Sequence, residues 1–463
     1  MIRSLRLALH ALIIASLFVA CGPSAREPES PTFGPARAGD DRVLIVADIH
    51  LDPFDRKELV DELAAAPIER WERIFSRAPN ALSSYGHDAN ASLYLSGLRA
   101  MREAIPRPSY LLLAGDLLAH DFHRRFIWSA TRNDAFSYRR FVEKTSDFVR
   151  YELAKSFPQT RIFPTIGNND GYCGDYRSTP HDAFLAHQAA GWAPLIGPRG
   201  QWPQVTATFA RGGYYSAETA SGLRILSLNT VFLAKLYENR CGDSAERPAE
   251  EELRWLHREL EQLPQGRPTL LLTHIPLGID GFKTFFHLGF PVPLLKPAYQ
   301  ALLRKEIDAP GHGVATVITG HLHDVGYRQT DEGRKDDKPI VVVPSISPVF
   351  GNAPAFTIAS ISKRGVIDDM SVHRLETRSL RAPTWANVVD FNARYHLNGV
   401  TAQSIERLHL RTGADRCLRA VVERDSVGDA PALAIVTLDR KAMWCTNGAL
   451  TPEAFLRCDG AKY

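Results

Sequence analysis

The stretch "FPTIGNND" (residues 163–170) has two interpretations, because an apolar run ends there in a glycine and three polar residues. One interpretation is an ordinary turn, since Gly, Asn and Asp are typical turn residues. The other is a site that needs a neutral oxygen donor at the tip of a strand. The stretch alone does not separate the two, so the neighbouring segments have to be compared with it.

Similar short apolar runs recur along the chain and predict buried strands. They lie at 43–47, 110–114, 161–166, 223–228, 269–273, 314–319 and 340–343. Amphipathic helical patterns lie between them at 91–104, 136–155 and 250–263, and a hairpin is predicted from 355–362 and 366–374. This alternation predicts a layered α/β domain over residues 42–376. After Arg381 the pattern becomes mostly helical, so we expect a small helical C-terminal domain over 377–463.

Polar side chains follow five of the predicted strands. In chain order they are Asp48 and His50; Asp116, His120 and Asp121; Asn168, Asn169 and Asp170; His274; and His321 and His323. Any one of them could be a satisfied surface or core group, but ligands collect at the carboxyl ends of strands in open α/β sheets. Nitrogen and oxygen donors of this kind suit Zn, Mn or Fe, and they are too many for one tetrahedral ion. The pattern therefore predicts two divalent metal ions, with an amide oxygen coordinating without added charge.

The order of these motifs resembles the calcineurin-like metallophosphoesterase superfamily over roughly residues 43–350. Asp-x-His, Gly-Asp, Gly-Asn, a His at a strand end and Gly-His-x-His occur in the family's order. The resemblance implies a layered αββα sandwich and two metal ions that clamp a phosphate and lower the pKa of a bridging water. Carried over by position, one metal takes Asp48, His50 and His323, the second takes Asn168, His274 and His321, and Asp116 bridges them.

One departure from the family concerns proton transfer. The family usually has a catalytic His after the ligand Asn, whereas this chain has Asn169. We expect Asn169 to be a catalytic residue at that position, although its amide can donate a hydrogen bond but cannot deliver a proton near neutral pH. The block "GDLLAHDF" (115–122) resembles the acid sphingomyelinase-like phosphodiesterase branch, in which a His four residues beyond the bridging Asp is a proposed proton donor. The resemblance implies that His120 is the general acid; otherwise it is a surface histidine at a helix start.

The resemblance therefore implies a phosphodiesterase in which metal-bound hydroxide attacks phosphorus and His120 protonates the leaving oxygen. Its substrate is a small-molecule or lipid phosphoester. A phosphomonoesterase or polyphosphatase on the same metals is an alternative, because the "GNND" form also resembles fungal endopolyphosphatases of this branch. An inactive envelope binding lipoprotein is a third interpretation, but all seven candidate metal ligands are present.

The N-terminus predicts export. Arg3 and Arg6 precede an apolar run at 7–20, which is shorter than the ~20 residues of a membrane span and fits a signal peptide. The segment "LFVACG" (17–22) resembles a bacterial lipobox. We therefore expect a signal peptide at 1–20, a lipid on Cys21, a flexible tether over 21–41, and an outer-membrane or periplasmic lipoprotein anchored by that lipid. An ordinary cleaved signal peptide or a buried helix is the alternative.

Charge and cysteine content argue against a nucleic-acid partner and against a thiolate zinc site. The 463 residues carry a formal net charge of +3 and no long basic run, so no nucleic-acid partner is expected. The absence of a CxxC pair argues against a thiolate zinc site. In an oxidising compartment we expect two disulfides and one free thiol, with the pairing open, among the cysteines that remain after Cys21: Cys173, Cys241, Cys417, Cys445 and Cys458.

Overall fold

The computed structural model describes residues 37–460, apart from residues 38, 78–80, 240, 242–246, 263, 265, 331–336, 377–383 and 439. The predicted signal peptide, the lipid on Cys21 and most of the tether lie outside the described residues. Within the described part of the chain, no helix is both long and apolar enough to cross a bilayer.

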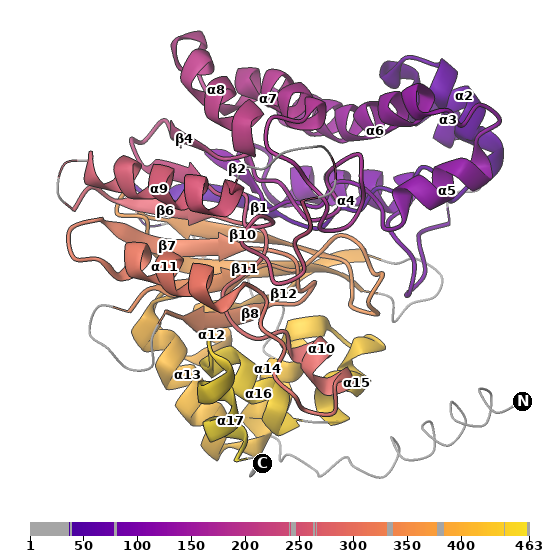
Figure 1. The fold of residues 1–463 in the computed structure, drawn as a ribbon. Helices are drawn as coiled ribbons and strands as arrows, with labels where there is room; N and C mark the ends of the chain where they lie inside the picture. Colours follow the sequence, from indigo (N-terminus) through magenta and orange to yellow (C-terminus); the bar gives the residue numbers. More distant parts are fainter. Residues whose placement is uncertain are drawn as a thin grey trace, which may run out of the picture.

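Two six-stranded mixed sheets form the centre of the molecule (Figure 1). The first has the order β12 (Thr384–Asp390), β11 (Ile367–Glu376), β10 (Ala355–Ile361), β1 (Asp41–Val46), β2 (Tyr110–Leu113) and β3 (Arg161–Pro164). The second has the order β4 (Tyr215–Glu218), β5 (Arg224–Ser227), β6 (Thr269–Leu272), β7 (Val314–Thr319), β9 (Pro339–Val342) and β8 (Gly326–Gln329). Strands β1 to β3 run parallel, as do β5, β6, β7 and β9. Their carboxyl ends therefore share one edge in each sheet.

Helices cover the outer faces of the sheets, which confirms the predicted αββα architecture. Helix α4 (Ala91–Ala104) packs on β10 in the first sheet, and α9 (Pro248–Glu261) and α11 (Pro297–Asp308) lie side by side over the second (Figure 1). Every residue of β2, β6 and β9 is buried, as expected for strands covered on both faces. The other α-helices between β1 and β12 are α2 (Val60–Ala65), α3 (Trp71–Phe75), α5 (Phe122–Ser129), α6 (Ala135–Ser156), α7 (Ala183–Ile196), α8 (Trp202–Gly212) and α10 (Gly281–Phe286).

The predicted domain boundary at residue 377 needs correction. Strand β12 pairs antiparallel with β11 and so belongs to the first sheet. The helical region begins after it, at Phe391, and gathers at one end of the sheets (Figure 1). It comprises α12 (Phe391–Tyr395), α13 (Ala402–Ala414), α14 (Arg416–Val427), α15 (Ala432–Leu438), α16 (Arg440–Gly448) and α17 (Pro452–Asp459). Most of β12 is only partly buried, since it is an edge strand, and it therefore lacks the continuous apolar run that marks the other strands.

Two disulfides lie among the described residues. One joins Cys173 to Cys241 across 68 residues, and the other joins Cys445 to Cys458 between α16 and α17. Cys417 is also disulfide-bonded, and no described cysteine is free. The expected free thiol, which assumed that the sulfur of Cys21 carries a lipid, is therefore not found among the described residues.

Candidate metal centre

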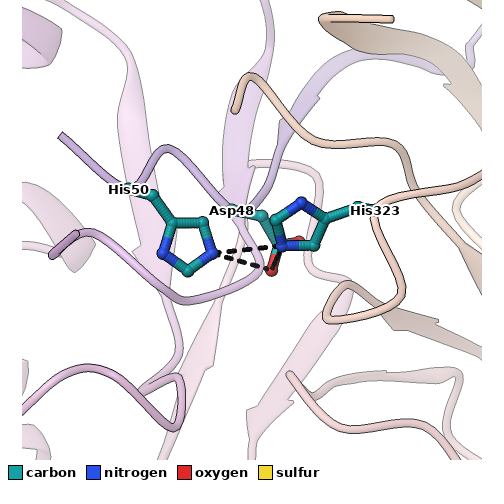
Figure 2. Close-up of side chains that lie close together, drawn as sticks. All are labelled: Asp48, His50 and His323. Carbon is teal, nitrogen blue, oxygen red and sulfur yellow. Dashed lines mark hydrogen bonds and ion pairs between the residues drawn. The ribbon is translucent and has the colours of Figure 1, made fainter. Parts of the chain in front are cut away.

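The seven predicted metal ligands converge where the carboxyl ends of five strands meet. They come from the loops after β1, β2 and β3 in one sheet and after β6 and β7 in the other. Figure 2 shows Asp48, His50 and His323 pointing toward one another. Two groups each bring three ligand atoms within 4.8 Å of one another: Asp48, His50 and His323 form one, and Asp116, His274 and His321 form the other.

The first group gathers acceptor atoms around one point. Nδ1 of His50 lies 2.9 Å from the Leu118 carbonyl and donates to it, which leaves Nε2 with a lone pair. That Nε2 lies 3.1 Å from Nε2 of His323 and 3.4 Å from Oδ2 of Asp116, while Asp48 Oδ1 lies 3.4 Å from His323 Nε2. Burial, with the nearby His120, lowers the pKa of His50 to about 4, so its ring is neutral. One shared proton cannot satisfy all four atoms, whereas a divalent cation among them can.

Hydrogen bonds to backbone and side chains also orient the second group. Nδ1 of His274 donates to the Ala114 carbonyl at 2.7 Å, and its Nε2 lies 2.9 Å from Oδ1 of Asn168. The Asn168 amide is oriented by its own nitrogen, which donates to Asp175 at 2.6 Å, so its oxygen faces the histidine. Nε2 of His321 lies 3.0 Å from the Tyr176 hydroxyl, which leaves the other ring nitrogen for an ion.

Asp116 lies between the two groups. Its Oδ2 is 3.4 Å from Nε2 of both His50 and His274. Burial opposes ionisation of this carboxyl, but His274 and His50 hold its pKa well below the usual range. Burial likewise acts to lower the pKa of His274, yet Asp116 and Asp48 outweigh it and raise that pKa to about 9. The centre therefore favours positive charge, and the residues present fit two divalent ions with Asp116 as the shared ligand.

The stretch at residues 163–170 contains the candidate ligand Asn168 and two residues, Asn169 and Asp170, that hold neighbouring groups in place. Asn169 donates to Asp116 twice, from its backbone N–H at 2.8 Å and from its side-chain amide at 2.9 Å. The Asp170 carboxylate accepts from the backbone N–H groups of Gly167, Asp116 and Leu117 at 2.8–3.0 Å. Burial, followed by Asp116, raises the pKa of Asp170 to about 7. Asn169 thus holds the Asp116 carboxylate in place, and Asp170 ties the loops after β2 and β3 together.

Several of these side chains sit on strained backbone. The φ angles of Asp48, His50, Asp116, His321 and His323 lie between 44° and 74°, in the left-handed region. Such residues cost on the order of 1–3 kcal/mol each and cluster at functional sites. Hydrogen bonds across loops offset this cost, for example from the His321 backbone N–H to the Asp48 carboxylate at 2.9 Å.

Gly167 allows the two ligand loops to approach each other. A Cβ atom at this position would lie 2.1 Å from Oδ1 and 2.3 Å from the backbone nitrogen of Asp116. We expect Gly167→Ala to lower the free energy of unfolding by about 3 kcal/mol, at the upper end of overpacking costs, because backbone must move. Thermal unfolding measures this, with Gly200→Ala as control, since a Cβ there meets nothing within 4 Å. Equal melting temperatures for the two variants would contradict the prediction.

A model of the family described as calcineurin-like phosphoesterase matches residues 41–325, which is more than half of the chain. The chain belongs to the calcineurin-like phosphoesterase family. This confirms the resemblance inferred from the motif order.

Curated relatives of this calcineurin-like phosphoesterase are named as phosphodiesterases. Sphingomyelinase phosphodiesterase D of Dictyostelium discoideum is 26% identical over 68% of this chain and 65% of its own length. Cyclic GMP-AMP phosphodiesterase SMPDL3A of Mus musculus is 24% identical over 74% of this chain and 71% of its own length. The chain spans less than two thirds of the length of several Dictyostelium relatives. Among solved structures, PhoD matches with a TM-score of 0.41 and 11% identity over 77% of this chain and 70% of its own.

His120 of this calcineurin-like phosphoesterase lies beside the first group of ligands. Its ring stacks on His50 with centroids 4.2 Å apart, and its side chain is 29% exposed. Both its Nδ1 and its backbone N–H lie 2.9 Å from the carboxylate of Asp88, which Arg125 also contacts at 3.3 Å. Burial acts against the charged form of His120, but the hydrogen bond and charge of Asp88 raise its pKa.

Asp88 is a site residue that sequence reasoning missed. It lies in "YGHDANAS" (85–92), a segment that resembles the sphingomyelinase-like branch, but no spacing relates it to a histidine 32 positions later. A further signal was the carboxylate itself, two residues before the N-cap of α4. Asn90 provides that cap by accepting from the backbone of Leu93 at 3.0 Å.

Proposed function

We propose that the protein is an exported phosphodiesterase that uses two divalent metal ions and His120 as its general acid. The observation that carries this proposal is the placement of His120: a partly exposed imidazole, paired with a buried carboxylate, lies against the ring of a candidate metal ligand. A surface histidine at a helix start has no need of a buried partner such as Asp88.

The metal ions would be Zn, Mn or Fe, held by the two ligand groups with Asp116 shared between them. Divalent ions bound there supply Lewis acidity toward a phosphoryl oxygen and lower the pKa of water. Asn169 would keep both oxygens of Asp116 oriented through its two hydrogen bonds. It acts as a positioning residue in this proposal, and not as a proton donor.

His120 would deliver the proton that a leaving alkoxide needs. Because Nδ1 is held by Asp88, the opposite nitrogen Nε2 is the one available to a substrate. The raised pKa favours the protonated ring, which is the state required of a general acid.

We expect Asp88→Asn to shift the pH profile without removing His120. Loss of the carboxylate lowers the pKa of His120, so the alkaline limb of kcat/KM for an alkyl diester should move to lower pH. The same pH profile is measured for the wild type and for the control Asp55→Asn. Asp55 is a nearby carboxylate that contacts Asn90. An alkaline limb that stays in place would show that His120 does not set it.

A diester is the substrate class favoured by the names of the relatives. The exposed ring of Phe350 supports a substrate with an apolar or aromatic portion, because it lies 4.7 Å from the ring of His323 and 5.4 Å from that of His120. A leaving group protonated by His120 would therefore lie next to this ring.

The proposal is tested with purified protein whose metal content has been measured. Bis-nitrophenyl phosphate, nitrophenyl phosphate, ATP, sphingomyelin and polyphosphate form the substrate panel. We expect diester cleavage that is lost on chelation and restored by added metal. Fast monoester or polyphosphate cleavage with an inert diester would favour a phosphomonoesterase or polyphosphatase, and no turnover by metal-loaded protein would favour a binding protein.

Export and lipid attachment are proposed from the N-terminal sequence. The disulfides of the described region support an oxidising compartment. Mass spectrometry of protein purified from membranes tests the anchor: a diacylated N-terminal Cys21 is expected, and a mature N-terminus further along the chain would exclude it.

A further inference from the structure

A second cluster of histidine and carboxylate side chains lies far from the candidate metal centre. His257 and Glu261 are one turn apart on α9, Glu306 lies on α11, and His312 lies in the turn before β7. These helices pack side by side over the second sheet (Figure 1). One ligand atom each from His257, Glu261 and His312 lies within 4.8 Å of the others.

The cluster is at the opposite edge of the sheet from the catalytic groups. His312 precedes β7 and His321 follows it, and the six residues of β7 span about 20 Å at the usual rise of a strand. None of the four side chains belongs to the phosphoesterase motifs, so the proposed catalytic chemistry does not use them.

His312 has the hydrogen bonding of a metal ligand. Its Nδ1 lies 2.9 Å from the backbone carbonyl of Glu306 and donates to it, so in the neutral ring Nε2 carries the lone pair. That Nε2 faces Oε1 of Glu261 at 3.3 Å, and the His312 side chain is only 10% exposed. Metal-binding histidines commonly donate their other ring nitrogen to a carbonyl or carboxylate in this way.

The distances fit a tetrahedral ion. Ligand atoms about 2.1 Å from a tetrahedral Zn²⁺ are about 3.4 Å from one another, close to the observed 3.3 Å between His312 and Glu261. Glu306 Oε2 lies 3.1 Å from Nδ1 of His257 and 3.5 Å from Nδ1 of His312, so it contacts both rings. Two imidazoles with carboxylates favour Zn²⁺ over Ca²⁺ or Mg²⁺, which prefer oxygen ligands alone.

We propose that His257, Glu261 and His312 bind a Zn²⁺ ion at this edge, with Glu306 orienting the two histidines. The ion would join the C-terminal end of α9 to the turn that leads into β7, and Glu306 would connect the C-terminal end of α11 to the two histidines. Its role is structural, because the site is outside the candidate metal centre and ties together elements distant in sequence. Water would complete the coordination, since His257 and Glu261 are more than half exposed.

Zinc stoichiometry of the full chain tests the proposal. Chelator-treated protein is dialysed against one buffered free zinc concentration, and bound zinc is measured for the wild type, His257→Ala and Glu261→Gln. Each variant should bind one zinc ion fewer per chain, or bind it about 10-fold or more weakly, while diesterase activity is unchanged. Zinc should also raise the melting temperature of the wild type more than that of the variants.

The control variant is His187→Ala. His187 also pairs with a carboxylate, Asp147, at 2.8 Å, and it lies on a different helix outside the cluster. It should bind as much zinc as the wild type. Equal zinc content in wild type, His257→Ala and Glu261→Gln would overturn the proposal and leave the cluster as charge pairs. Because the readout is a difference between variants, it does not depend on how many ions the catalytic centre holds.

Discussion

His120→Ala is expected to lower kcat by about 10²–10⁴-fold for diesters that release an alkoxide, and to change nitrophenyl ester cleavage little. An alkoxide is a strong base and must gain a proton as the bond to phosphorus breaks, whereas nitrophenolate leaves unaided. Asp88 holds one ring nitrogen of His120 and leaves the other available, which supports the proposed role. Steady-state kinetics with matched methyl and nitrophenyl diesters measures the difference.

The matched control for this prediction is His87→Ala. His87 is exposed and adjacent to Asp88, so its removal tests for a general effect of losing a nearby histidine. Both substrates should be cleaved at wild-type rates. If His120→Ala slows both esters equally, the proton-donor role is wrong and the residue acts through the His50 ring on which it stacks.

Asp116→Asn is expected to remove the shared ligand and with it about 10³-fold or more of the activity on every substrate. Metal ions contribute several kcal/mol of transition-state stabilisation, and an amide oxygen cannot replace a carboxylate that bridges two cations. The side chain keeps its shape and loses a buried charge, so the fold should persist. Metal analysis should show fewer than two ions per chain in the catalytic centre, and circular dichroism should be unchanged.

Asp121→Asn is the control for that variant. Asp121 lies five positions along the same loop, is 58% exposed and pairs with Arg124 on the surface. Its substitution should leave both metal content and turnover at wild-type values. Full activity in Asp116→Asn, with two ions retained, would exclude Asp116 as the bridging ligand.

The strands and the candidate ligands were largely predictable because both depend on local sequence. A short apolar run followed by Asp, Asn or His marks a buried strand that ends at the site, and Asp48 and His274 follow β1 and β6 in this way. Strands β4, β8 and β12 were missed because their apolar patterns are short or interrupted.

The supporting contacts were not predictable, because they join segments far apart in the chain. Asp88 meets His120 across 32 residues, and Asp170 meets Leu117 across 53. Which loops lie together depends on the packing of two sheets, and no residue spacing encodes it. Asn169 is an example. Its amide shows from the sequence that it cannot transfer a proton, but its hydrogen bond to Asp116 depends on how the chain folds.

The candidate metal ligands come from both sheets, and this has a consequence for how the protein acquires its ions. His50 and His323 are separated by 273 residues, and Asn168 and His274 by 106. An ion that bound the unfolded chain would have to close loops of this length against their conformational entropy, whereas the folded sheets already hold these residues together. Metal uptake is therefore expected to follow folding rather than to initiate it, so the polypeptide should acquire its ions in the compartment where it reaches its native state.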